Sequence, residues 1–487
     1  MRFEFTLGPS GHEHPRRRPN GVRRLLVLAD LRGSGTAGPA DLLDRPIVKV
    51  DLDNVDAVLA RCAPVVQLGP DAGNVRIEIR TFDDFHPDRL IEHVPAFARL
   101  RDIRARLKQP STFAAAVAEL HGGTLGVPAA TGSAPQLSAP ESSAATLERL
   151  LGRTAATGEL PATAPATVSG TVDALIRQAI APHIVEAPSP QLPQMLAAVD
   201  AAMTHLMRAV LHDPAFQRTE ATWRSIQWLV STLELDETQQ LQLLHVTRDE
   251  LLAESRPDSA LWRRLLERER QAGADGGYAC VVCDATVGGT DADLAGLATL
   301  GALANALDAP FVASASPALV GSRSMADSPH PREWQVDPAL ETKWTALRSS
   351  QAADRVGLAL PRVLLRLPYG TKSDRIGAFG FEEQTTPPHH EWFLWGNPAY
   401  LCGVVAMRAL GDDAEGLDVA GFEGLPAFTW RDDDEPKLQP VAEIAPTEEA
   451  VVSIQGRGLM PVVSYKNRNA VRLVALHSIS APPKELI

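Results

Sequence analysis

Short apolar runs separated by amphipathic segments recur along most of the chain and predict an α/β fold. Residues 25–29 are apolar at every position, which is typical of a strand covered on both faces, whereas residues 74–80 alternate and predict a strand with one wet face. Apolar residues three and four positions apart predict amphipathic helices. Strands are predicted at 24–30, 45–50, 74–80, 241–246, 278–284, 310–314 and 356–367, and helices at 54–62, 88–108, 195–212, 214–230 and 291–307.

Two segments indicate how the strands are connected. Residues 278–314 hold a strand, a helix and a second strand, which predicts a parallel pair with a right-handed crossover. Residues 356–400 hold an extended core strand, a turn at Tyr369-Gly370 and an aromatic arm that includes Trp395. We therefore expect a mixed sheet with flanking helices.

Changes in composition predict how the chain is divided. Residues 122–170 are mostly Ala, Thr, Ser, Pro and Gly, so they lack the large apolar side chains of a core and are expected to form a flexible linker. Residues 1–21 are polar and are expected to form a flexible arm; docking of its arginines on an acidic neighbouring surface is the alternative. We expect a small N-terminal α/β domain at 22–121 and a larger α/β domain at 171–487.

The net charge indicates which kinds of partner are expected, and the cysteine content indicates the cellular compartment. The formal net charge is −13, and such a surface repels nucleic acid and anionic membranes, so other proteins are the expected partners. Four cysteines among 487 residues do not form a disulfide framework, which favours a reducing cytoplasm. The N-terminus lacks the apolar core of a signal peptide, and no segment is expected to insert into a membrane.

Two motifs contain residues that could bind a metal, but another role is favoured for each. Cys280 and Cys283 form a CxxC pair, but residues three apart on a strand point to opposite faces, so buried core cysteines are favoured over a metal or redox site. His389, His390 and Glu391 precede an aromatic strand. Because adjacent histidines on an extended chain cannot both face one ion, metal binding is the less favoured interpretation.

Two further motifs resemble binding loops incompletely. The acidic run 432–435 lacks the spacing of a calcium loop and is interpreted as a solvated hairpin tip. Residues 370–373 match the end of a phosphate-binding loop, but Leu365 stands where the first glycine is required.

Arg366 is predicted to form a structural ion pair with Glu382 or Glu383, in the rigid centre of residues 356–400. We predict no catalytic, cofactor-binding or metal-binding residue and no cofactor, and we do not expect an enzyme. A hydrolase or metal enzyme that depends on His389 or Asp284 is a remote alternative.

Three motifs near the N-terminus carry a resemblance to a known family. They are a strand that ends in Leu28-Ala29-Asp30, the segment RPIVKVDLDNVDAVLAR and the segment IRTFDDFHPDRLIEHVPAFARLRDIRARL. These motifs, which cover most of residues 22–120, resemble the small sheath subunit of type VI secretion systems, the TssB (VipA) family.

Further landmarks follow in one order between Ala197 and Ser478. They include AVLHDPAFQRTEATWRSIQWLV, GLALPRVLLRLPYG, FLWGNPAY and GLMPVVSYKNRNAVRLVALHSI. These segments are similar to the large sheath subunit of the same systems, the TssC (VipB) family. The resemblance thus implies a sheath-subunit-like α/β body and a fusion of a small and a large subunit in one chain.

The resemblance also implies a mechanical function. In that family the two subunits pair and polymerise in the cytoplasm of bacteria into a contractile sheath around stacked Hcp rings, and contraction drives protein secretion. The implied partners are copies of the chain, other sheath subunits, an Hcp-like tube and baseplate proteins. A ClpV-type unfoldase is a further candidate, with 171–181 as the counterpart of the helix it grips.

Two expectations follow for particular segments. The predicted helix 88–108 is the candidate face for binding the large-subunit-like part. The chain ends at Ile487, before the C-terminal extension usual in large subunits, which exchanges strands between neighbours. The alternative function is therefore a sheath-derived accessory protein, an adaptor, cap or assembly regulator that does not polymerise alone.

Overall fold

The computed structural model describes residues 21–33, 42–122, 191–254, 256, 259–272, 277–410, 420–465 and 468–487. Nearly all of the predicted arm and linker, and the whole helix predicted at 171–181, lie outside these residues. The chain divides into two compact units, one of Met1–Arg101 with Asp200–Ile487 and one of Asp102–Val199.

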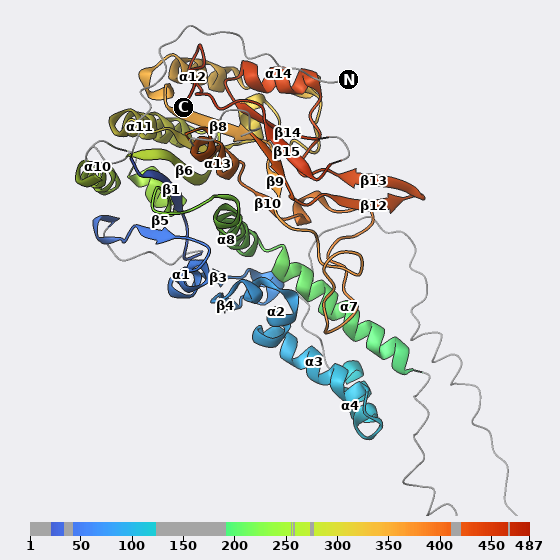
Figure 1. The fold of residues 1–487 in the computed structure, drawn as a ribbon. Helices are drawn as coiled ribbons and strands as arrows, with labels where there is room; N and C mark the ends of the chain where they lie inside the picture. Colours follow the sequence, from blue (N-terminus) through green and yellow to red (C-terminus); the bar gives the residue numbers. More distant parts are fainter. Residues whose placement is uncertain are drawn as a thin grey trace, which may run out of the picture. The chain divides into compact units, whose positions relative to one another are not determined.

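A mixed sheet of nine strands forms the centre of the first unit (Figure 1). The sheet order is β11 (Gly421–Glu423), β15 (Ala470–Leu473), β14 (Met460–Ser464), β8 (Val356–Leu360), β7 (Phe311–Ala315), β6 (Tyr278–Val287), β1 (Arg23–Ala29), β5 (Gln239–His245) and β2 (Val48–Val50). The six strands from β14 to β5 are parallel to one another. At the edges, β2 pairs antiparallel with β5, β15 with β14 and β11 with β15.

Helices and three small sheets complete the described fold. The helices are α1 (Val55–Cys62), α2 (Pro87–His93), α3 (Pro95–Leu107), α4 (Pro110–Gly122), α7 (Leu192–Leu211), α8 (Pro214–Thr232), α9 (Arg248–Ala253), α10 (Ala260–Ala272), α11 (Asp291–Leu307), α12 (Pro338–Arg348), α13 (Ala399–Ala409) and α14 (Glu448–Gly456). The small sheets pair β3 (Val65–Gln67) with β4 (Arg76–Glu78), β9 (Val363–Leu364) with β10 (Trp395–Gly396), and β12 (Phe428–Asp432) with β13 (Glu435–Gln439).

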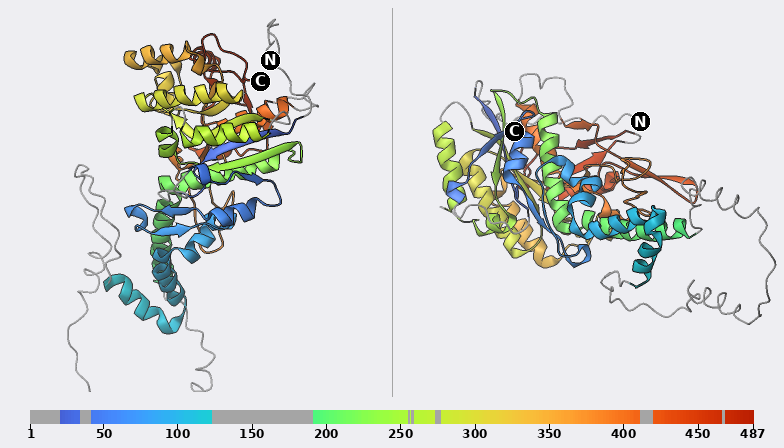
Figure 2. Two further views of the ribbon diagram at one scale, coloured as in Figure 1. Left: turned by 90° about the vertical axis from the view of Figure 1, so that its left-hand side faces the viewer. Right: turned by 90° about the horizontal axis from the view of Figure 1, so that it is seen from below.

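Strand β1 lies inside the sheet although it comes from the N-terminal segment. Leu25 is opposite Leu241 of β5 on one side and opposite Cys280 of β6 on the other, and both pairings are parallel. Figures 1 and 2 show this blue strand between its green neighbours. Residues 23–50 and 239–473 thus build one sheet, while the domain boundaries proposed at 22, 122 and 171 stay predictions.

Both faces of β1 are covered, which explains the apolar run at residues 25–29. Leu26 and Leu28 belong to a hydrophobic cluster with Val281 and with apolar residues of α11. On the opposite face, α13 approaches so closely that a Cβ on Gly403 would lie 2.8 Å from a methyl carbon of Val282. The glycine is therefore required by the distance between helix and sheet.

The prediction of one continuous helix at 88–108 is wrong, because the helix is interrupted at Val94. Helix α2 ends at His93, Val94 has extended backbone angles (φ −82°, ψ 116°), and α3 begins at Pro95. The residue before a proline is disfavoured in the helical conformation, so the helical pattern restarts at Pro95. The apolar spacing continues across the break, which is why it predicts one helix.

The second unit is described only in part. Within it Arg106 pairs with Asp102 at 2.8 Å and also with Glu119 of α4. None of the described helices in either unit is both long and apolar enough to cross a membrane.

Candidate functional sites

Arg366 lies between two buried glutamates. Its Nε donates to Oε1 of Glu220 at 2.8 Å and its Nη1 to Oε2 of Glu383 at 2.7 Å. Neither glutamate side chain has exposed surface. The ion pair predicted with Glu383 is confirmed, whereas Glu382 accepts hydrogen bonds from the amide and hydroxyl of Thr371.

Glu383 is held as a carboxylate by several donors. The Tyr369 amide donates to its Oε2 at 2.7 Å, and His212 Nε2 lies 3.4 Å from its Oε1. Burial raises the pKa of Glu383, but the charge of Arg366 and the hydrogen bonds from His212 and Arg366 outweigh burial and lower the pKa to about 2. The cluster is thus charged, paired and rigid, which suits a structural role.

Glu220 was not predicted from the sequence as part of this cluster. This residue lies on α8, where it is buried on the same helix as Phe216 and Trp223. It also accepts from Arg224 Nε at 2.6 Å, one helical turn further on. The sequence signal that could have found Glu220 is its position one helical turn after Phe216. A charged side chain among buried apolar positions requires a partner.

The N-terminal segment contacts the loop that follows Tyr369. The Asp88 carboxylate, at the start of α2, accepts hydrogen bonds from the amides of Gly377 and Ala378 at 2.9 and 3.1 Å. The rings of His86 and Tyr369 meet edge to face with centroids 5.1 Å apart. Because Tyr369 also bonds Glu383, the N-terminal segment is coupled to the buried charge cluster.

Further polar contacts join the N-terminal segment to His245 at the end of β5 and to Glu250 in α9. Arg45 binds both oxygens of Glu250, at 2.8 and 2.5 Å, and the Leu31 amide donates to His245 Nδ1 at 3.1 Å. The hydrogen bond from Arg45 is the main cause that lowers the pKa of Glu250 to about 2. These contacts specify one docking geometry for the two segments.

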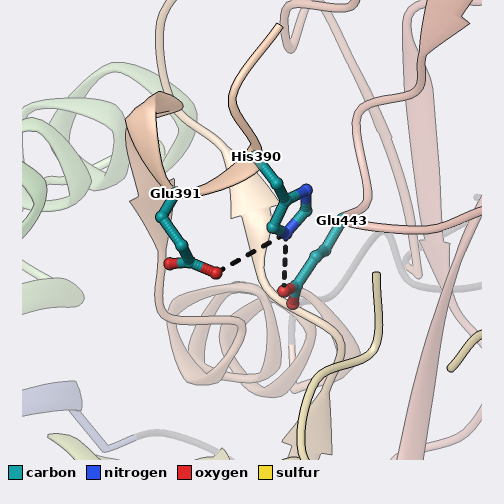
Figure 3. Close-up of side chains that lie close together, drawn as sticks. All are labelled: His390, Glu391 and Glu443. Atoms are coloured by element: carbon teal, nitrogen blue, oxygen red, sulfur yellow. Dashed lines mark hydrogen bonds and ion pairs between the residues drawn. The ribbon is translucent and has the colours of Figure 1, made fainter. Parts of the chain in front are cut away.

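His390, Glu391 and Glu443 bring ligand-type atoms to within 4.8 Å of one another (Figure 3). His390 Nε2 lies 3.0 Å from Oε1 of Glu443 and 3.9 Å from Oε1 of Glu391. Arg362 Nη2 lies 2.6 and 3.1 Å from those same two carboxylate oxygens. A guanidinium therefore occupies the side where a divalent cation would have to approach both carboxylates.

The same cluster keeps Glu443 ionised. Burial raises its pKa, but hydrogen bonds from His390 and Arg362 and their charges outweigh burial and lower the pKa to about 2. His389 takes no part in this cluster, since its ring stacks on Trp392 with centroids 5.0 Å apart. Sequence reasoning grouped His390 with Glu391 but missed Glu443, which is remote in the chain.

The cysteine pair is placed as expected for core residues. Cys280 and Cys283 are buried and free, and Cys283 lies in the hydrophobic cluster that covers the α11 face. Burial raises the pKa of the Cys283 thiol to about 12 and also raises that of Cys280. Neither thiol is therefore activated as a nucleophile or a metal ligand.

Asp284 and His389, the residues of the remote enzyme alternative, have different surroundings. Asp284 accepts from the Thr222 hydroxyl at 2.6 Å and from Asn397 Nδ2 at 3.1 Å, and burial raises its pKa. His389 is stacked on Trp392. In the described residues no hydrogen bond or ion pair joins the two side chains.

Comparisons with known proteins agree with this architecture. Residues 193–480 match the family model VipB (EvpB/VC_A0108, tail sheath N-terminal domain), and residues 23–121 match T6SS_VipA (Type VI secretion system, VipA, VC_A0107 or Hcp2).

The type VI secretion system sheath protein TssC1 of Pseudomonas aeruginosa is 29% identical over 304 residues. The matched region covers 59% of this chain and 61% of that protein. Because the VipB model covers more than half of the 487 residues, the chain belongs to the VipB family of type VI secretion sheath proteins, with a VipA-like segment at its N-terminus.

Proposed function

We propose that the chain is a structural subunit of a type VI secretion sheath that carries the small-subunit-like and large-subunit-like parts covalently joined. The observation that carries the proposal is the position of β1, from the VipA-like segment, between β5 and β6 of the VipB-like segment. A strand inside a sheet cannot be removed without leaving two unpaired edges. The two parts are therefore expected to act as one building block.

Covalent joining has a physical advantage for such a pair. Two parts that are joined in one chain meet at a high effective concentration, because the chain between them limits how far apart they can move. Pairing then becomes an intramolecular step. Every subunit that enters an assembly carries both parts in a fixed ratio.

The proposed partners are copies of the chain, other sheath subunits, an Hcp-like tube and baseplate proteins, and the proposed location is the cytoplasm. A ClpV-type unfoldase is a further candidate partner. The buried cluster around Arg366 supports a force-bearing scaffold, because its charges are paired inside the protein. We propose no catalytic role.

Negative-stain electron microscopy of the purified chain, alone and with an Hcp-type tube protein, tests the proposal. Tubes or helical fragments with a regular subunit repeat are the expected result. A persistent monomer or small ring under all conditions would reject the polymerising subunit and favour the accessory alternative, an adaptor or cap.

A further inference from the structure

Strands β1 and β5 end at an aspartate and a histidine that lie side by side. His245 is the last residue of β5, and Asp30 follows Ala29, the last residue of β1 and the register partner of His245. His245 Nδ1 lies 3.7 Å from Oδ1 of Asp30. The histidine is 8% exposed, whereas the aspartate side chain is 35% exposed. The pair thus joins the VipA-like strand to its VipB-like neighbour, and solvent reaches it from the aspartate side.

Three successive amides of the loop after β1 donate to this pair. The Leu31 amide donates to His245 Nδ1 at 3.1 Å. The amides of Arg32 and Gly33 donate to Oδ1 of Asp30 at 3.2 and 3.0 Å. An imidazole nitrogen accepts only while it carries no proton, and a carboxylate oxygen accepts more strongly when it is ionised. All three hydrogen bonds therefore favour the deprotonated pair.

The second ring nitrogen of His245 offers no alternative place for an added proton. Because Nδ1 accepts from an amide, Nε2 carries the hydrogen of the neutral imidazole. Nε2 is buried, and within the described part of the chain it has no hydrogen-bond partner. An added proton therefore lies between Nδ1 and Oδ1 of Asp30, whichever of the two atoms holds it. In that position it competes with the Leu31 amide for Nδ1.

Four charged side chains from different parts of the chain surround the pair. They are Arg32, Arg45, Arg218 and Glu250. Arg45 and Glu250 form an ion pair and largely neutralise each other. Burial raises the pKa of Asp30 to about 6, and burial with the charge of Arg45 lowers the pKa of His245 to about 4.

These two pKa shifts act on stability in opposite directions. The raised pKa of Asp30 stabilises the fold below its ordinary value of 3.8, and this contribution is lost as the pH rises through about 6. The lowered pKa of His245 stabilises the fold above its ordinary value of 6.5, and this contribution is lost as the pH falls through about 4. The free energy of unfolding should therefore change little when the pair takes up one proton, so the effect is local.

The loop held by the pair also contacts the small β3–β4 sheet. The Arg32 oxygen accepts from the Val65 amide at 2.7 Å. Gly33 lies so close to β3 that a Cβ there would be 2.4 Å from the Val65 oxygen. Strand β1 itself is paired with β5 along all seven of its residues. Displacement of residues 31–33 would thus loosen the attachment of β3 while β1 stays in the sheet.

We propose that Asp30 and His245 form a one-proton switch that holds residues 31–33 when it is deprotonated and releases them when it is protonated. The switch sets how firmly the β3–β4 sheet of the VipA-like segment is attached to the shared sheet. This regulatory property goes beyond the proposed function, because it applies whether or not the chain forms tubes.

Hydrogen exchange of the full chain, labelled at pH 7, 6 and 5 and read by mass spectrometry, tests the switch. After correction for the intrinsic pH dependence of exchange, protection at residues 31–33 should fall at least about tenfold from pH 7 to pH 5. The amides of Thr238 and Gln239 are the matched control, because they donate to Asp236 with the same sequence spacing. The hydrogen bond from the Thr238 hydroxyl lowers the pKa of Asp236, so protection at these two amides should stay constant.

Two substitutions remove proton uptake and keep hydrogen-bond acceptors. Asp30→Asn retains an oxygen for the two amides that this residue accepts, and His245→Asn retains an oxygen near the position of Nδ1. The double variant should protect residues 31–33 equally at pH 7 and pH 5. The same fall in protection as in the wild type would overturn the inference.

The wild-type protein alone also decides the question if the double variant does not fold. Unchanged protection at residues 31–33 from pH 7 to pH 5 would overturn the switch. An equal loss at residues 238–239 would overturn it as well, because it would show a general loosening of the protein. A loss confined to residues 31–33 supports the switch.

Discussion

The guanidinium of Arg366 lies 2.7 Å from Oε2 of Glu383, and both side chains are buried. Glu220 binds the same guanidinium from α8 and also accepts from Arg224, so two arginines balance two carboxylates that come from distant parts of the chain. Removing either carboxylate leaves a buried positive charge only partly compensated. The geometry of residues 356–400 therefore depends on the complete cluster.

Glu383→Gln should lower the free energy of unfolding by about 3 to 5 kcal/mol, the usual cost of breaking a buried ion pair. Urea unfolding followed by tryptophan fluorescence measures the change. Glu92→Gln is the control, since Glu92 pairs with Arg89 at the surface and its loss should leave the free energy of unfolding nearly unchanged.

Exchanging the two charges gives a sharper test of the cluster. The double variant Arg366→Glu with Glu383→Arg restores that pair but places a second acid against Glu220. It should remain less stable than the wild type. Full recovery would show that Glu220 contributes nothing to the interaction.

The stability of the protein should fall as the pH is lowered from about 4.5 towards 2, partly through Glu443. Its folded pKa of about 2 lies below the ordinary value of 4.5, so its contribution is complete above the ordinary value and is lost as the folded carboxylate takes up a proton. Glu443→Gln should be less stable at pH 7. Its free energy of unfolding should also depend less on pH in this window, by up to about 1.4 kcal/mol per pH unit.

Urea midpoints measured at intervals between pH 5 and pH 2 give this slope for both proteins. Glu435→Gln, at an exposed hairpin acid, is the control and should keep the wild-type slope. The same slope in Glu443→Gln as in the wild type would contradict the assignment of a lowered pKa to Glu443.

Gly301→Ala should be strongly destabilising. A Cβ at Gly301 of α11 would lie 1.8 Å from the backbone oxygen of Ala352, so helix and loop would have to separate. Gly456→Ala in α14 is the matched control, because a Cβ there meets nothing within 4 Å and alanine favours the helix. Thermal unfolding should show a lower Tm for the first variant and an unchanged or higher Tm for the second.

Zinc should not stabilise the wild-type protein, because Arg362 already binds the carboxylates of Glu391 and Glu443. Thermal unfolding with and without added Zn²⁺ tests this prediction. A rise in Tm that is abolished by His390→Ala would contradict it. Arg362→Met should open the cluster, so a zinc-dependent rise is expected only in that variant.

The individual strands could be predicted because the part of a strand that is covered on both faces is apolar, as in residues 25–29 of β1 and 278–283 of β6. The position of β1 between β5 and β6 could not be predicted from the same pattern, since apolar runs do not specify which strand pairs with which. The motif resemblance suggested that the two parts associate. The shared sheet shows how they do so.

The candidate sites, too, could be predicted only in part from the sequence. Glu383 could be predicted as a partner of Arg366 because the two are close in sequence, whereas Glu220 and Glu443 reach their arginines from distant segments. Pro95 was a signal for a helix break, but the apolar spacing continues across it and predicted one helix. Local sequence patterns thus identified charged side chains in buried segments more readily than they identified the partners of those side chains.

The VipA-like and VipB-like parts of one chain build a single sheet. Insertion of a specific protease site between residues 123 and 190, followed by cleavage and size-exclusion chromatography with light scattering, tests this arrangement. The two fragments should elute together at the mass of the intact chain and separate only in denaturant. Fragments that separate in buffer without denaturant would contradict the placement of β1 between β5 and β6.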